Sequence, residues 1–106
     1  MKQQMVVIHL DDASLVWLSG VVGASLAPAL YDVLRELVEQ QLKPVMVDCT
    51  DVAALDDGVV SVLAAASMQA ARRGGIDLRL PRGRCHLVKD ATAVRHAISA
   101  AYPAAA

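Results

Sequence analysis

The sequence predicts an α/β domain in which a mixed, roughly four-stranded sheet is covered by about three helices. Two apolar segments near the N-terminus are separated only by a turn, which favours a β-hairpin. Helix-like and strand-like periodicities then alternate along the rest of the chain. The 106 residues suffice for one hydrophobic core and are too few for two, so we expect a single domain over residues 1–106.

The hairpin and the first helix are predicted by turn residues and apolar spacing. Residues 5–10 form a β-branched run that ends at Asp11 and Asp12, and residues 15–18 form a second strand. Ser25 is the expected N-cap of a helix that ends at Lys43 and Pro44. Its apolar positions recur at helical period: Leu26, Leu30, Val33, Leu34, Leu37 and Val38.

A buried central strand and a second helix are predicted next. Residues 45–47 are the strand, and a loop over residues 52–55 leads to the helix, from about Gly58 to Arg73. Gly74 and Gly75 predict the C-terminal end of this helix, because glycine adopts the left-handed cap conformation at little cost. The apolar face of this helix contains Val59, Val62, Leu63, Ala66 and Ala70.

The C-terminal third predicts one more strand and one more helix. Residues 76–80 alternate apolar and charged side chains, which is strand period, and a turn follows over residues 81–84. Residues 85–88 fit either an extended segment or the approach to a helix. Asp90 is the expected N-cap of the last helix.

Composition and motifs exclude several classes of function. The net charge is −1 without a basic face, so no nucleic acid is expected as a partner. No apolar run is long enough to span a bilayer and no signal peptide is recognised, so we expect a cytoplasmic protein. No catalytic set, metal cluster or phosphate loop is found, and we expect neither enzyme activity nor a cofactor.

The two cysteines, Cys49 and Cys85, match no metal-ligand spacing. In a reducing cytoplasm we expect two buried or half-buried thiols. A regulatory disulfide between them is the alternative, and the sequence does not show whether the two Cα atoms lie within bonding distance.

Several of these features together resemble the STAS family of anti-sigma-factor antagonists, over nearly the whole chain. The family places an Asp at the end of a central strand, then an Asp-Ser-Ser/Thr-Gly motif that opens a helix, then an Arg-Gly-Gly turn before a strand. The matching positions here are Asp48, Leu55-Asp56-Asp57-Gly58 and Arg73-Gly74-Gly75, preceded by Leu18-Ser19-Gly20.

The resemblance implies a STAS-like fold and a regulatory function by protein binding. Bacterial members of the family bind anti-sigma factors that are ATP-dependent serine kinases of the ATPase fold, and phosphorylation of the motif Ser or Thr ends the binding. The implied partner surface comprises Asp56, Asp57, Gly58, Ser61, Ala64, Ala65 and Met68.

This chain departs from the family at the phosphorylated position. Asp57 stands just before Gly58, where a hydroxyl is expected. One hypothesis is that Asp57 mimics a phosphorylated state, and another is that the domain recognises a different partner. A plain N-cap is a third interpretation, because an acid at a helix start is stabilising without any function. Thr50 and Ser61 are further candidate phosphorylation sites.

Two alternative functions remain. STAS-like domains also serve as subunits of ABC lipid-transport complexes and of stress-sensing scaffolds, which the missing hydroxyl suits equally well. A receiver-like phosphoacceptor domain would use Asp11 and Asp12 with Asp48 or Asp57 to bind Mg²⁺, and Lys89 beside them. The closely spaced hairpin and the small number of strand–helix units disfavour a receiver. The oligomeric state is left open.

Overall fold

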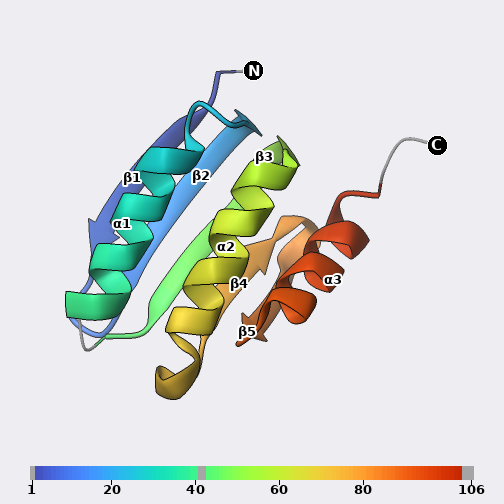
Figure 1. The fold of residues 1–106 in the computed structure, drawn as a ribbon. Helices are drawn as coiled ribbons and strands as arrows, with labels where there is room; N and C mark the ends of the chain where they lie inside the picture. The colour runs from blue at the N-terminus through green and yellow to red at the C-terminus, as the bar shows by residue number, and fades with distance from the viewer. Residues whose placement is uncertain (1, 41–42, 104–106) are drawn as a thin grey trace.

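The computed structural model describes residues 2–40 and 43–103, which form five strands and three α-helices around one sheet (Figure 1). The strands are β1 (Gln4–His9), β2 (Ser14–Val22), β3 (Val45–Leu55), β4 (Ile76–Leu80) and β5 (Arg84–Val88). The α-helices are α1 (Ala27–Gln40), α2 (Asp57–Gln69) and α3 (Ala91–Ala101), and two short 3-10 helices span Ala71–Arg73 and Pro81–Gly83.

The sheet is mixed, and its strands lie in chain order from β1 to β5. The central pairs β2–β3 and β3–β4 are parallel, whereas the outer pairs β1–β2 and β4–β5 are antiparallel. The three helices all lie on one face of the sheet (Figure 1), and no described helix covers the other face. The predicted mixed α/β architecture and the hairpin are therefore confirmed.

Of two details of the predicted sheet, one that was left open is now decided and one was wrong. The ambiguous residues 85–88 belong to a fifth strand, β5, four of whose five residues are exposed. The predicted loop over residues 52–55 is the second half of β3, which pairs with β2 as far as Leu55. The alternation of buried and exposed residues breaks after Cys49, where the register between β2 and β3 shifts, so this part of the strand lacks the usual pattern.

The start of α1 also differs from the prediction. The helix begins at Ala27, so Ser25 lies two residues outside it and is not the N-cap. The Ser25 hydroxyl instead accepts a hydrogen bond from the Gln3 side-chain amide nitrogen, and the side-chain oxygen Oε1 of Gln3 accepts from the Gly23 backbone amide (3.1 Å). These contacts fasten the start of the chain to the β2–α1 turn.

The core lies between the sheet and the helix layer. Strand residues that face the helices are fully buried, as Val16, Leu18 and Val47 show. From the helices, Leu34, Leu63 and Val94 complete the same cluster. None of the helices in the described part of the chain is long and apolar enough to cross a membrane.

Candidate functional site

The start of α2 lies at the end of β3, beside the end of β2. The Asp56 amide donates to the Val22 carbonyl oxygen (3.2 Å), and the Asp56 carboxylate accepts from the Val59 amide (3.0 Å). Asp56 is thus the N-cap of α2, with the extended backbone that such a residue adopts. The N-cap interpretation is confirmed for Asp56, which fixes where α2 leaves the sheet.

Asp57 is not needed as a cap and lies in a different environment. It is the first residue of α2, and its side chain is 88% exposed. The helix dipole favours an acid at this position, but the effect is small for an exposed group. The Asp57 carboxylate therefore remains available for an interaction outside its own helix.

That interaction comes from Arg95 on α3, which sequence reasoning missed. The Arg95 guanidinium forms an ion pair with Asp57 Oδ1 (3.1 Å), and its second terminal nitrogen donates to Ser61 Oγ (3.2 Å). Asp57 and Ser61 are four residues apart, so they lie one above the other on the same face of α2. One arginine thereby joins the first two turns of α2 to α3. We call Asp57, Ser61 and Arg95 the arginine-bridged cluster.

The remaining predicted surface residues differ in how exposed they are. Gly58 is exposed, the Met68 side chain is prominent at 59% exposure, and Ala65 is half-buried. Ala64 was predicted on the exposed face but is 4% exposed, so that placement is wrong. Because α2 packs between α1 and α3, only a narrow stripe of its surface reaches solvent.

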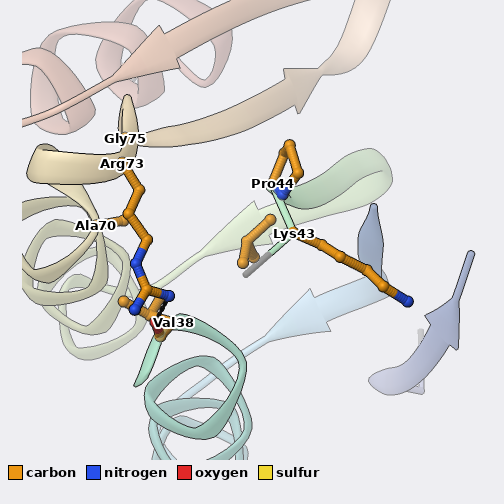
Figure 2. A pocket seen from close by; sticks show the side chains of 7 residues that line it. Val38, Lys43, Pro44, Ala70, Arg73 and Gly75 are labelled. Atoms are coloured by element: carbon orange, nitrogen blue, oxygen red, sulfur yellow. Dashed lines mark hydrogen bonds between the residues drawn. The ribbon is translucent and has the colours of Figure 1, made fainter. Parts of the chain in front are cut away.

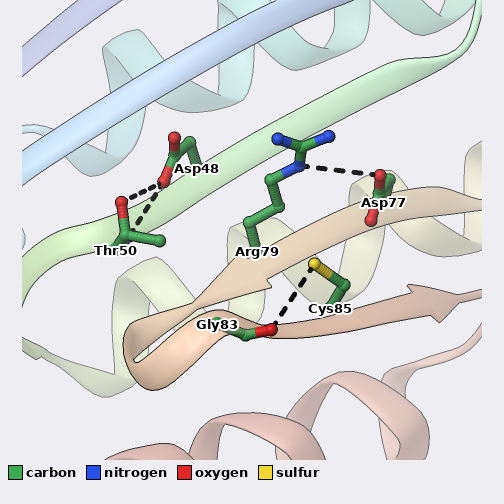
Figure 3. Close-up of polar contacts among 6 residues, drawn as sticks. All are labelled: Asp48, Thr50, Asp77, Arg79, Gly83 and Cys85. Carbon is green, nitrogen blue, oxygen red and sulfur yellow. Dashed lines mark hydrogen bonds and ion pairs between the residues drawn. The ribbon is translucent and has the colours of Figure 1, made fainter.

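Thr50, the other candidate phosphorylation site, lies away from this cluster. Its hydroxyl donates to Asp48 Oδ1 (2.6 Å), and its amide donates to the same oxygen (2.9 Å). Asp48 is opposite Arg79 in the β3–β4 register, and Figure 3 shows it with Thr50 and the Arg79–Asp77 ion pair. Thr50 thus belongs to an acidic part of the sheet rather than to the start of α2.

The two cysteines lie on opposite faces of the sheet. Cys49 is fully buried in the core under the helices, whereas Cys85 is exposed and shares the helix-free face with its partner Arg79 (Figure 3). Both thiols are free in this structure, without the alternative disulfide, and the expectation that both are buried or half-buried is wrong for Cys85. Burial, and secondarily the charge of Asp48, raises the pKa of the Cys49 thiol to about 12.

A small cavity lies at the other end of the sheet (Figure 2). It has a volume of about 200 Å³ and is lined by residues including Val38, Pro44, Ala70 and Arg73. The Arg73 guanidinium donates to the Val38 carbonyl oxygen and so supports the end of α1. The cavity is smaller than most ligand pockets, which start at about 300 Å³, and we assign it a structural role.

The receiver-like alternative, with either Asp48 or Asp57 as the acceptor, is contradicted by the sheet. A receiver has five parallel strands, whereas the pairs β1–β2 and β4–β5 are antiparallel here. Asp11 and Asp12 lie in the β1–β2 turn, at the end of the sheet where β2 and β3 begin, whereas Asp57 follows the far end of β3. Lys89 follows β5, whose last residue Val88 pairs with the start of β4. Within residues 2–40 and 43–103, no three His, Cys, Asp or Glu side chains gather to hold a metal ion.

The comparisons with known proteins agree with the fold. The family model described as "Mlab, STAS domain" matches residues 5–99. The chain therefore belongs to the STAS domain family, and the resemblance predicted from its sequence is confirmed. No curated protein matches the chain in sequence.

Two solved structures share the fold. An anti-sigma factor antagonist from Mycobacterium paratuberculosis matches with a TM-score of 0.67 and 22% identity, covering 96% of this chain and 84% of that chain. The anti-sigma factor antagonist SpoIIAA in its unphosphorylated form matches with a TM-score of 0.58 and 9% identity, covering 70% of this chain and 67% of that chain. The α/β layer with helices on one face is therefore the STAS fold.

Proposed function

We propose that this chain is an anti-sigma-factor antagonist, without enzyme activity of its own, that acts in the cytoplasm by binding an ATPase-fold anti-sigma serine kinase. Membership of the STAS family and a fold shared with two anti-sigma factor antagonists support this function. The observation that carries it is the exposed start of α2, because the family motif falls there and Asp56 holds it in place.

The partner is proposed to dock on the exposed stripe of α2, from Asp57 to Met68. Asp57, Gly58, Ser61 and Met68 are exposed along it, and the half-buried Ala65 allows a close approach. Met68 supplies the large apolar side chain at the far end of the stripe. A flexible thioether adapts well to a partner surface, so Met68 is the proposed apolar anchor.

Asp57 gives this surface a fixed charge where other family members change theirs by phosphorylation. A carboxylate supplies −1, whereas a phosphoserine supplies about −1.5 to −2. The Arg95 guanidinium offsets the carboxylate, so a partner meets an ion pair rather than a lone acid. We therefore propose that Asp57 and Arg95 together define the nearly neutral state of the docking surface that a partner meets when the chain is unphosphorylated.

The experiment that tests this function is affinity capture of the tagged domain from its own cell lysate, with and without ATP, followed by mass spectrometry. We expect recovery of an anti-sigma factor with a kinase fold. Recovery of other complexes alone, or of no partner, would contradict the antagonist role and leave the fold assignment intact.

The role of Asp57 is then measured with the recovered partner. Asp57→Ser restores a hydroxyl and removes the ion pair with Arg95, so we expect the partner affinity to change severalfold. Asp77→Ser is the control, because it also removes an ion-paired Asp, here a half-buried one, but lies on the helix-free face. Equal affinities for the wild type and both variants would rule out a role for the Asp57 charge.

A second candidate function keeps the fold and changes the partner to an ABC lipid-transport complex or a stress-sensing scaffold. The observation that favours it is the absence of a hydroxyl at position 57, which a constitutive subunit does not need. Recovery of a transporter ATPase or of scaffold proteins in the same capture experiment would establish it in place of the antagonist role.

A further inference from the structure

The Ser61 hydroxyl has a guanidinium next to it and is open to solvent. Arg95 donates to Ser61 Oγ at 3.2 Å, and Ser61 is exposed on the face of α2 that the proposed partner contacts. Ser61 also lies one helical turn after position 57, so its hydroxyl is adjacent to the position at which the family motif carries its own. The geometry therefore offers a hydroxyl and a cation together at the start of α2.

Thr50 has the opposite electrostatic environment. Its hydroxyl donates to Asp48 Oδ1 at 2.6 Å, so a phosphate on Thr50 would lie against a carboxylate and lose that hydrogen bond. A phosphate on Ser61 would also lie one turn from a carboxylate, that of Asp57, but it would be within reach of the Arg95 guanidinium, which binds phosphate oxygens in a bidentate manner. Of the two hydroxyls, the structure favours Ser61.

We propose that Ser61 is the phosphate acceptor of this chain, in place of position 57, and that Arg95 is the counter-ion of the resulting phosphoserine. This inference rests on the proposed function, because the phosphoryl donor is ATP bound to a partner serine kinase. Ser61 Oγ forms a new bond to the γ-phosphorus while the bond from that phosphorus to the β,γ-bridging oxygen breaks. ADP leaves, and the hydroxyl proton passes to a base of the kinase.

The phosphate would change the docking surface through the arginine that it shares with Asp57. A phosphoserine carries about −1.5 to −2 charges and three acceptor oxygens. It therefore competes with Asp57 for the single guanidinium of the arginine-bridged cluster. Arg95 moves toward the phosphate, and Asp57 becomes an unpaired acid. The surface changes from nearly neutral to strongly negative, which is the consequence that phosphorylation at position 57 has in the family pattern.

The pairing of the phosphate with Arg95 is tested on the domain alone, with phosphoserine incorporated at position 61. Phosphorus NMR gives the pH at which the phosphate titrates. The Arg95 guanidinium favours the dianion and the Asp57 carboxylate opposes it, so the second pKa, usually about 6, is expected about half a unit or more lower with Arg95 than without it. R95Q is expected to reverse the shift. R35Q is the matched control, because Arg35 pairs with Glu39 on α1. If R95Q leaves the titration midpoint of the phosphate unchanged, Arg95 is not the counter-ion of the phosphoserine and this part of the proposal is overturned.

The acceptor itself is tested by incubating the tagged chain with ATP in its own cell lysate and mapping phosphate by mass spectrometry. We expect phosphate on Ser61, its loss in S61A and its retention in T50A. Both side chains are exposed, so neither variant should unfold the domain. An unphosphorylated Ser61, or undiminished phosphate in S61A, overturns the proposal. If the kinase is captured and Ser61 stays unmodified, the proposed function stands and this inference alone fails.

Discussion

Asp56 and Asp57 are neighbours in the sequence and differ in what their carboxylates contact. Asp56 binds the amide of Val59 within its own helix, whereas Asp57 reaches Arg95 on another helix. The first contact stabilises the fold. The second is an exposed ion pair, and such pairs contribute at most about 1 kcal/mol to stability.

This difference predicts unequal effects on stability. Asp56→Ala removes the N-cap of α2 and is expected to lower the free energy of unfolding by about 0.5–2 kcal/mol, as measured by urea denaturation. Asp90→Ala should cost a similar amount, because Asp90 caps α3 through the Ala93 amide (2.8 Å). Asp57→Ala should cost less than either. A larger loss for Asp57→Ala than for Asp56→Ala would contradict these assignments.

Part of the site was predictable from the sequence and part was not. Asp56, Asp57 and Gly58 were found because the turn that opens a helix has a local residue pattern. Arg95 was not found, since it lies 38 residues from Asp57 and only helix packing brings the two together. Ala64 was misplaced because an alanine fits either a helix surface or a close contact between helices.

At the scale of elements, the helices and strands that could be predicted were those whose apolar residues recur at a regular spacing. The helices and the short strand β4 have clear periodicity, and their positions were predicted within a few residues. β5 is an edge strand whose residues are mostly exposed, so it has almost no pattern to recognise. The second half of β3 was missed because its register with β2 shifts twice, which interrupts the alternation of buried side chains.

The connection into β4 predicts a contrast between two adjacent glycines. Both have a positive φ, +98° at Gly74 and +91° at Gly75, which costs an alanine about 1–2 kcal/mol. A Cβ on Gly74 would meet no atom within 4 Å, whereas one on Gly75 would lie 2.2 Å from the Val88 carbonyl oxygen. Thermal unfolding should show a moderate decrease in the melting temperature for Gly74→Ala and a much larger decrease for Gly75→Ala. Equal losses would mean that β5 moves aside freely.

At the scale of the whole molecule, the stability of the fold depends on pH through a thiol outside the proposed site. The pKa of Cys49 is raised from 9.0 in the unfolded chain to about 12 in the fold, chiefly by burial. Between these values the folded chain keeps a proton that the unfolded chain releases. The contribution of the Cys49 thiol to the free energy of unfolding is therefore complete below about pH 9 and is lost as the pH rises toward 12.

Urea denaturation at a series of alkaline pH values measures this dependence. The wild type is expected to lose stability more steeply than Cys49→Ala above about pH 9. Burial also raises the pKa of Tyr102, so the variant should still lose some stability in this range. The difference between the two slopes reports the thiol together with its effect on Tyr102, and identical slopes would contradict a buried Cys49.

The placement of the two thiols on opposite faces of the sheet gives the native chain a selective labelling position. Cys49 is enclosed in the core and Cys85 is exposed, so a maleimide dye should attach to β5 without any engineered cysteine. The dye would lie on the helix-free face, away from the exposed stripe of α2. Fluorescence anisotropy of the labelled wild-type chain could then report partner association while Asp57, Ser61 and Arg95 all keep their natural side chains.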